Sequence, residues 1–279
     1  MVIGAFVAGV LAAAALWWLM KATFDLPIFQ RANFRDQPVA TAAGVLLPIA
    51  ALILEAALTV ADALGADVDA ATIGPRRLVV LATVGFGLLG LLDDLAGAGE
   101  SGGYAGHLRA LARGRLTTGG VKLLGGAALA IVVVAAGTEH RSLPRLIADA
   151  ALVALAANLG NLLDRAPGRV TKSGLAAFVV LAIATGAGPE LVGVAAVVGA
   201  AAGLLIPDLR EQLMLGDAGA NVIGAVLGVG IVLACSTGVR LMALIAVAVL
   251  NLASEMVSFS RVIERVPPLR ALDRLGRRS

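Results

Sequence analysis

The chain has 279 residues, of which 59% are hydrophobic and only 15% charged, and its mean hydropathy is +0.93. Soluble domains carry about a quarter charged residues, so this composition excludes an ordinary soluble protein and indicates a membrane protein. One cysteine, Cys235, and two histidines, His107 and His140, exclude a disulfide framework and disfavour a zinc site. The isoelectric point near 9.6 does not require nucleic acid, because basic residues in a multi-span chain usually encode orientation, and we expect no nucleic-acid partner.

Nine apolar segments follow one another along the chain, and most approach the roughly 20 residues that a membrane-spanning helix requires. They cover residues 2–20, 39–61, 77–96, 119–137, 145–163, 174–187, 190–206, 219–236 and 239–258. Segment 174–187 is the shortest and therefore the least certain to span. We expect an all-α, polytopic helical bundle of about nine transmembrane helices, with one domain over residues 1–258 and a tail over residues 259–279.

Lysine and arginine are unevenly divided between the two sets of alternating loops. Only five of the 22 basic residues fall in one set, and these are Arg76, Arg77, Arg141, Arg145 and Arg240. Because cytoplasmic loops carry the excess of Lys and Arg, the other 17 predict an outer N-terminus and a cytoplasmic C-terminus. The Ala-, Gly- and Arg-rich composition is typical of a high-GC bacterial genome, so we expect a multi-pass protein of the bacterial cytoplasmic membrane.

Asp93 and Asp94 end an otherwise apolar run. A carboxylate at the centre of a membrane helix costs about 2.5–3.5 kcal/mol, so the pair should lie at the membrane edge. Adjacent helical residues point about 100° apart, so one carboxylate can approach a site while the other meets a cation or a backbone donor. The alternative is a polar stop at the end of a helix.

A second polar motif ends the fifth segment. Asn158, Asn161 and Asp164 recur every three residues and span about 120° of one helix face. Such a stripe would be costly against lipid, so it should face a polar cavity or partner helices. The alternative interpretation is that the asparagines only form hydrogen bonds between helices.

A third motif, Gly216-Asp217-Ala218-Gly219-Ala220-Asn221, opens the eighth segment. Glycines such as Gly219 let the backbone approach a ligand closely, and Asp217 suits a helix N-cap. The start of a helix at this face also suits an anion. Capping alone would explain the aspartate equally well.

The loop after the aspartate pair is basic. It contains His107, Arg109, Arg113 and Arg115 and leads to Lys122, which could pair with phosphate. The alternative is that these charges only set the topology. The tail, with leucines at three-residue spacing and arginines between them, could form a basic amphipathic helix on anionic lipid or be disordered.

Together, the acidic motifs and basic loops fit a site for phosphate and a divalent cation at the cytoplasmic face. Mg²⁺ favours one or two carboxylates together with substrate phosphates, and phosphoryl transfer needs mainly positioning and charge neutralisation. We therefore expect transfer between a soluble phosphate donor and a lipid phosphate.

At these residues the chain resembles the polyprenyl-phosphate N-acetylhexosamine-1-phosphate transferases. That superfamily includes the bacterial phospho-N-acetylmuramoyl-pentapeptide transferase and the undecaprenyl-phosphate GlcNAc-1-phosphate transferases. The resemblance rests on the order and spacing of three motifs: Asp93-Asp94, Asn158-x-x-Asn161-x-x-Asp164 and Gly216-Asp217-Ala218-Gly219. Phe34-Arg35-Asp36-Gln37-Pro38 resembles the first cytoplasmic loop of the family.

The resemblance implies a Mg²⁺-dependent enzyme, with Mn²⁺ as a substitute, that transfers a sugar-1-phosphate from a UDP-sugar to polyprenyl phosphate and releases UMP. Asp217 would be the main metal ligand, Asp94 a second ligand, and Asp93 or Asp94 would activate or position the lipid phosphate. Asn161 and Asp164 would contact the metal–diphosphate or nucleotide region. Other substrate contacts would come from Asn158, Lys122, His107, Arg109 and Gly219. The resemblance does not decide between a monomer and a homodimer.

The chain departs from the family pattern in three places. Arg165 and Pro167 replace a glycine and an acidic residue, no histidine follows His140, and no tenth span is evident. These departures support an alternative in which a catalytically inactive relative binds a lipid carrier or an envelope-assembly partner. A third alternative, a cation-coupled transporter, is disfavoured because the acidic residues gather at one face and not at the midplane.

Overall fold

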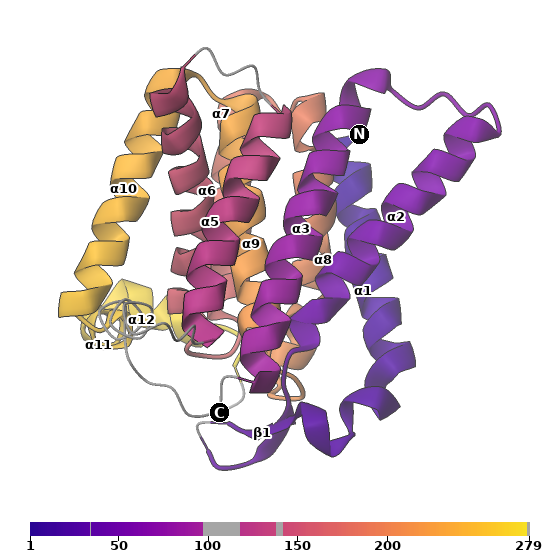
Figure 1. Cartoon of the computed structure of the whole chain (residues 1–279). Helices are drawn as coiled ribbons and strands as arrows, with labels where there is room; N and C mark the ends of the chain where they lie inside the picture. Colours follow the sequence, from indigo (N-terminus) through magenta and orange to yellow (C-terminus); the bar gives the residue numbers. More distant parts are fainter. Residues whose placement is uncertain (34, 97–117, 138–141, 278–279) are drawn as a thin grey trace.

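The computed structural model describes residues 1–33, 35–96, 118–137 and 142–277. It is an all-α bundle of long, roughly parallel helices, with a small hairpin and two short helices at one end (Figure 1). The long helices are α1 (Val2–Phe24), α2 (Leu46–Ala63), α3 (Ala70–Ala96), α5 (Thr118–Gly137), α6 (Leu143–Leu163), α7 (Arg169–Thr185), α8 (Val192–Leu209), α9 (Gly216–Ala234) and α10 (Thr237–Met256). The smaller elements are η1 (Pro27–Phe29), β1 (Gln30–Ala32), β2 (Pro38–Ala40), η2 (Ala43–Val45), η3 (Pro189–Leu191), α11 (Phe259–Arg265) and α12 (Pro267–Arg274).

The predicted multi-span architecture is confirmed. Within the described residues, eight helices are long and apolar enough to cross a membrane. Helix α7 holds the short segment 174–187 and has 17 residues, or about 25 Å of helix, so it is the shortest of the nine long helices described. The chain starts at one end of the bundle and finishes at the other (Figure 1), which is consistent with nine spans when α7 is counted with the other eight. Which end faces the cytoplasm stays a prediction.

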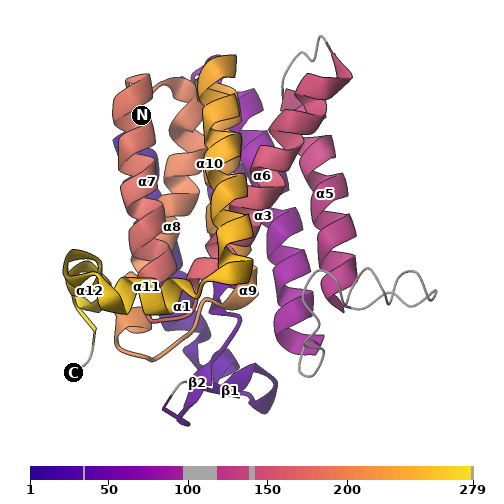
Figure 2. The ribbon, with the colours of Figure 1, turned by 90° about the vertical axis from the view of Figure 1, so that its left-hand side faces the viewer.

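Helix α9 lies at the centre of the bundle, where it packs against α3 and α6 (Figures 1 and 2). Gly160 of α6 and Gly224 of α9 allow this approach, because a Cβ on either would overlap a backbone carbonyl of the other helix. Small residues at such contacts are typical of membrane helices, where close van der Waals packing replaces the hydrophobic effect. The backbones of α6 and α9 therefore lie in direct contact, and this contact fixes the position of α9 in the bundle.

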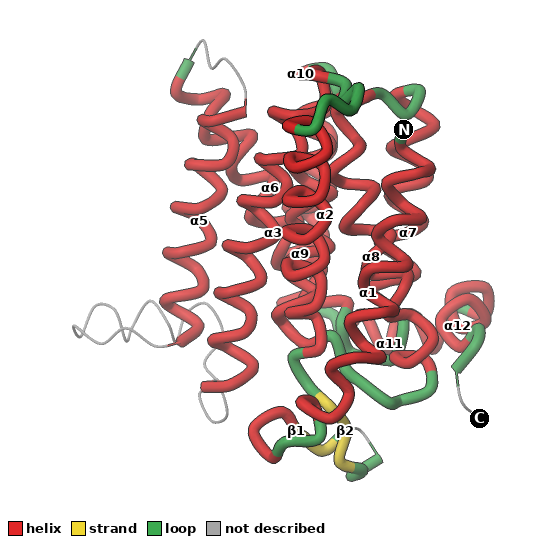
Figure 3. The backbone as a smooth tube through the Cα atoms, turned by 90° about the vertical axis from the view of Figure 1, so that its right-hand side faces the viewer, coloured by secondary structure: helices red, strands yellow, loops and turns green. Residues whose placement is uncertain are grey.

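The prediction that the second span begins at residue 39 is wrong, because residues 38–40 form a strand and the helical structure starts with the short helix η2 at Ala43. β2 pairs antiparallel with β1, and Ala42 adopts a left-handed conformation with φ 57°. The amides of Ala43 and Gly44 donate to the carbonyls of Met214 and Leu215, at 3.1 and 2.9 Å. These amides are therefore committed to the turn before α9 and not to a helix of their own. The β1–β2 hairpin projects beyond the helix ends at the C-terminal end of the bundle (Figure 3).

The prediction also misplaced the start of the third span, because α3 begins at Ala70 and not near residue 77. The Asp69 carboxylate accepts a hydrogen bond from the Ala71 amide at 2.9 Å, which caps the new start. Two turns further on, Arg76 is kept inside the bundle by Glu55 of α2, with 2.9 Å between Nε and Oε2. Because Arg76 has a buried acidic partner, it can lie inside the span, and the predicted start just after it was therefore too late.

Candidate functional site

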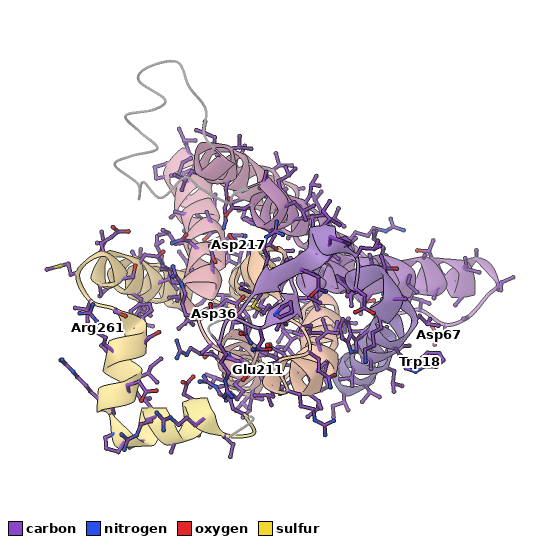
Figure 4. The ribbon with its side chains drawn as sticks, turned by 90° about the horizontal axis from the view of Figure 1, so that it is seen from below. Trp18, Asp36, Asp67, Glu211, Asp217 and Arg261 are labelled. Atoms are coloured by element: carbon purple, nitrogen blue, oxygen red, sulfur yellow. The ribbon has the colours of Figure 1, made fainter. Side chains whose placement is uncertain are left out.

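Four helices bring together residues from each of the three acidic motifs. Asp93 comes from the end of α3, Lys122 from the first turns of α5, Asn161 from the end of α6 and Asp217 from the start of α9. The Lys122 ammonium group forms ion pairs with the carboxylates of Asp217 and Asp93, the second at 3.4 Å. Asn161 Nδ2 donates to Asp217 Oδ2 at 3.1 Å. We call these four residues the Lys122 cluster; Figure 4 shows Asp217 among the helix ends.

Asp94 points away from this cluster and caps α9. Its two carboxylate oxygens accept hydrogen bonds from the backbone amides of Asp217 and Ala218, at 2.9 and 3.0 Å. A carboxylate at a helix N-terminus satisfies amides that the helix leaves unpaired and interacts favourably with the helix dipole. The two aspartates thus diverge as the 100° helical spacing predicts: Asp93 meets a cation and Asp94 meets backbone donors.

The expectation that Asp217 is itself the N-cap is wrong. Helix α9 starts at Gly216, the residue before it is Leu215, and neither supplies a side-chain cap. The cap comes across the bundle from α3, and Gly90 makes this possible because a Cβ there would overlap the Asp217 carbonyl. Capping by Asp94 frees the Asp217 carboxylate for the Lys122 cluster.

Gly219, predicted to contact substrate, packs against protein backbone in this structure. A Cβ at Gly219 would lie 2.9 Å from Gly44 Cα, and Gly44 has equally little room beside Gly219. The glycine allows η2 to approach the first turn of α9. Its observed role is therefore to hold the loop before α2 against the site.

Asn158 forms a hydrogen bond between helices, which was the alternative interpretation of that residue. Its Nδ2 donates to Asn251 Oδ1 of α10 at 2.6 Å. Asn251, which the sequence motifs did not single out, donates in turn to the carbonyls of Leu155 and Val247 at 3.1 and 2.7 Å. A lone asparagine in an apolar stretch is the signal that could have identified it.

Both asparagines line a cavity of about 740 Å³ between α3, α5, α6 and α10. Most of its wall is apolar. The polar lining comprises Asp93, Lys122, Asn158, Asn161, Arg165, Asn221, Asn251 and Glu255. We call it the apolar pocket.

A second cavity of about 230 Å³ lies under the β1–β2 hairpin, and we call it the acidic pocket. Its acidic lining consists of Asp164, Asp208, Glu211 and Asp217. Arg165 lines both pockets, so it stands where the two meet. The sequence motifs did not identify Asp208 or Glu211, although an acidic residue at the end of an apolar run is the same signal that identified Asp93.

Asp164 is the acidic residue most affected by its surroundings outside the spans, one position beyond the end of α6. Its pKa is raised well above the ordinary value. Loss of water around the carboxyl group is the main cause, and the negative charges of Asp208, Asp217 and Asp94 add to the rise in pKa. A carboxyl group in this position holds its proton to higher pH than usual.

The donor groups of the site suit a hard divalent cation. Asp93 and Asp217 offer carboxylate oxygens and Asn161 a carboxamide, and Mg²⁺ typically takes one or two protein carboxylates with the rest of its shell from phosphate and water. In the part of the chain that the structure describes, no three His, Cys, Asp or Glu side chains are grouped to hold a metal without such help. The Lys122 ammonium supplies the positive charge that these carboxylates require.

The predicted substrate contacts His107 and Arg109 lie outside the described residues. The fold and site define a multi-pass helical membrane protein with a carboxylate-rich site at one end of the bundle. Compared with known proteins, the chain matches no family model and no curated sequence.

Proposed function

We propose that this protein is a divergent polyprenyl-phosphate sugar-1-phosphate transferase of the bacterial cytoplasmic membrane, acting in cell-envelope glycan synthesis. The observation that carries the proposal is the convergence of Asp93, Lys122, Asn161 and Asp217, from four different helices, where the apolar and acidic pockets meet. A reaction between a lipid and a water-soluble donor needs such a junction.

The two pockets match the two substrates in polarity. The apolar pocket runs between membrane helices and suits a prenyl chain, with its phosphate at Lys122 and Arg165. The acidic pocket, at the end of the bundle, suits the ribose and base of a UDP-sugar, whose hydroxyl and N–H groups can donate to carboxylates. Its carboxylates repel a diphosphate, which would therefore lie toward Lys122 and Arg165.

In the proposed reaction an oxygen of the lipid phosphate attacks the phosphorus that bears the sugar. The bond from that phosphorus to the bridging oxygen breaks, UMP leaves with that oxygen, and a lipid diphosphate sugar is formed. Asp93 positions the lipid phosphate or accepts its proton, and Lys122 and Arg165 neutralise phosphate charge. Because phosphoryl transfer depends mostly on positioning and charge, no covalent intermediate on the protein is required.

A divalent cation, when bound, would neutralise charge on the donor diphosphate. Asp217 and Asp93 would hold it with Asn161, and Asp94 would act indirectly by fixing the start of α9. Since Lys122 pairs with the same two carboxylates, we expect its ammonium to turn toward substrate phosphate when the cation binds.

The test is UMP release by purified protein given a panel of UDP-sugars, undecaprenyl phosphate and Mg²⁺. Asp217→Asn should lower the rate about 10²–10³-fold, the usual cost of removing one preorganised charge-stabilising group. Asp67→Asn is the matched control, because Asp67 is exposed in the loop between α2 and α3, which lies at the other end of the bundle (Figure 1). Absence of UMP release across the whole panel would refute the enzyme proposal.

A second candidate, a non-catalytic lipid-carrier-binding protein, is favoured by one observation. Lys122 already pairs with both Asp93 and Asp217, so the cluster holds a cation before any metal binds. This candidate predicts saturable binding of undecaprenyl phosphate with no UMP release and no effect of Mg²⁺ on affinity. A Mg²⁺-dependent affinity would contradict it.

A further inference from the structure

The last two helices form a surface that the proposed reaction does not use. Helices α11 and α12 lie across the direction of the spans at the end of the bundle that carries the site (Figure 2). Viewed from that end, they form an L at the edge of the bundle, beside the spanning helices and not beneath their centre, with Arg261 labelled on α11 (Figure 4). This is the level and the position at which lipid headgroups would surround the bundle.

One side of this segment is fixed to the protein by polar contacts. Arg169, the first residue of α7, donates to both carboxylate oxygens of Asp273, at 2.8 and 3.0 Å, and the two side chains are only 6% and 4% exposed. Arg169 also donates to Ser260 Oγ at 2.9 Å, and Lys172 donates to the carbonyls of Leu272, Asp273 and Leu275. The attachment therefore uses charge and backbone carbonyls and not an apolar interface.

The apolar side of the segment points away from the protein. Leu272 and Leu275 are 64% and 66% exposed, and Leu269, Val262 and Val266 are exposed as well. An amphipathic helix on a water-soluble protein buries its apolar stripe and exposes its polar face. Here the leucine stripe is exposed together with the arginines, so the stripe needs an apolar environment outside the bundle.

The charge of the segment identifies that environment. Residues 259–277 contain five arginines against two acidic residues, Glu264 and Asp273. Asp273 pairs with Arg169 and with Arg277, and Glu264 pairs with Arg274 at 2.9 Å. Arginines flanking an exposed leucine stripe at headgroup level are complementary to an anionic lipid surface.

We propose that α11 and α12 form an interfacial element that inserts its leucine stripe into the anionic cytoplasmic leaflet while Arg169 and Asp273 hold its polar side to the bundle. The proposal does not depend on the transferase reaction. It has a consequence for the site, because Arg277 Nε donates to the Pro167 carbonyl at 3.1 Å and Pro167 lines the acidic pocket. Lipid contact therefore steadies a wall of that pocket.

The test uses the full chain in a Cys235→Ser background, with a fluorophore on Leu272→Cys or Leu275→Cys. The protein is reconstituted in nanodiscs of neutral or of 30% anionic phospholipid that contain a lipid-attached nitroxide quencher. Both probes should be quenched, and quenched more strongly in anionic lipid. A probe on Gln37→Cys, exposed on the hairpin that projects beyond the helix ends (Figure 3), should stay unquenched as the control.

The charge half of the proposal is tested with Arg270→Gln and Arg274→Gln. Each should lower the preference of the segment for anionic over neutral lipid about five-fold, since each basic residue near the surface contributes independently. Equal quenching in both lipids would show that the arginines give the segment no preference for anionic lipid and would overturn that part of the proposal. A Leu272→Cys probe that stays water-exposed in both lipids, in protein that remains monodisperse and folded, would overturn the whole proposal and leave the stripe for a protein partner.

Discussion

The far end of the bundle and the Lys122 cluster at the site end hold their charges in different ways. At the end away from the site, charges pair between helices: Arg76 and the more exposed Arg77 with Glu55, at 2.9 and 3.6 Å, and Arg240 with Asp149 at 3.1 Å. At the site end, within the described residues, the carboxylates of Asp93 and Asp217 share the Lys122 ammonium group, and the Asp94 carboxylate lies next to them on the backbone amides of Asp217 and Ala218.

A complete ion pair and a shared ammonium group have different physical consequences. A buried ion pair that is complete in itself holds helices in register, and it is costly to break because one charge is left behind. A cluster in which negative groups outnumber their cation can accept another cation or a proton. The following predictions test this distinction, from the largest expected effect to the smallest.

The largest effect should come from the far end. Arg240→Met removes the guanidinium group that pairs with Asp149, whose side chain is 5% exposed, and should lower the free energy of unfolding by about 3–5 kcal/mol. Denaturant titration in mixed micelles measures this. Arg145→Met, at an exposed position on the same side, should change stability little. Equal effects of the two substitutions would remove the distinction between the ends.

At the site end, Lys122→Met should create a dependence on cations. Asp93 and Asp217 then lose their ammonium partner, so Mg²⁺ should stabilise the variant by about 2.7 kcal/mol at 100 times its Kd. Thermal unfolding with and without Mg²⁺ measures the gain. Lys122→Arg retains the positive charge and should respond as the unaltered protein does. A Lys122→Met variant indifferent to Mg²⁺ would show that the carboxylates are structural.

Asp94 should matter as a hydrogen-bond acceptor. Asp94→Ala removes the cap of α9 and should cost about 0.5–2 kcal/mol of stability, whereas Asp94→Asn should cost less because its amide oxygen can still accept. Unfolding measurements on both variants, alongside Asp93→Ala, compare the adjacent aspartates. A larger loss for Asp94→Asn than for Asp94→Ala would contradict the capping role.

The smallest effect is a pH dependence due to Asp164. Its pKa is raised in the folded protein, so the folded state holds a proton that the unfolded chain has lost between the ordinary pKa of 3.8 and the raised one. In that window the stability should fall as pH rises. Asp164→Asn should flatten this part of the profile. If the free energy of unfolding instead rises with pH in that window, in the unaltered protein and in Asp164→Asn alike, another group is responsible.

The sequence predicted the spans well because each depends on local composition, and apolar runs of about 20 residues need no partner to be recognised. It placed span ends less well where a tertiary contact decided them. Residues 39–45 are held by the turn before α9, and Arg76 is held by Glu55, so neither boundary could be seen locally.

For the site, the sequence identified three members of the Lys122 cluster through their motifs and the fourth, Lys122, through its basic loop. The sequence could not show which of Asp93 and Asp94 meets the cation and which caps α9, because the cap joins residues more than a hundred positions apart. The same holds for Asn251 beside Asn158 and for Asp273 beside Arg169. Each pair depends on which helices are neighbours.

The cap on α9 also changes how relatives of this chain should be recognised. Position 94 needs two lone pairs aimed at backbone amides, a requirement that an amide or hydroxyl side chain can meet in part. Position 93 faces a cation and needs a formal negative charge. A search pattern that demands two acidic residues is therefore too strict at its second position, and homologues with Asp-Asn or Asp-Ser there belong in the same alignment.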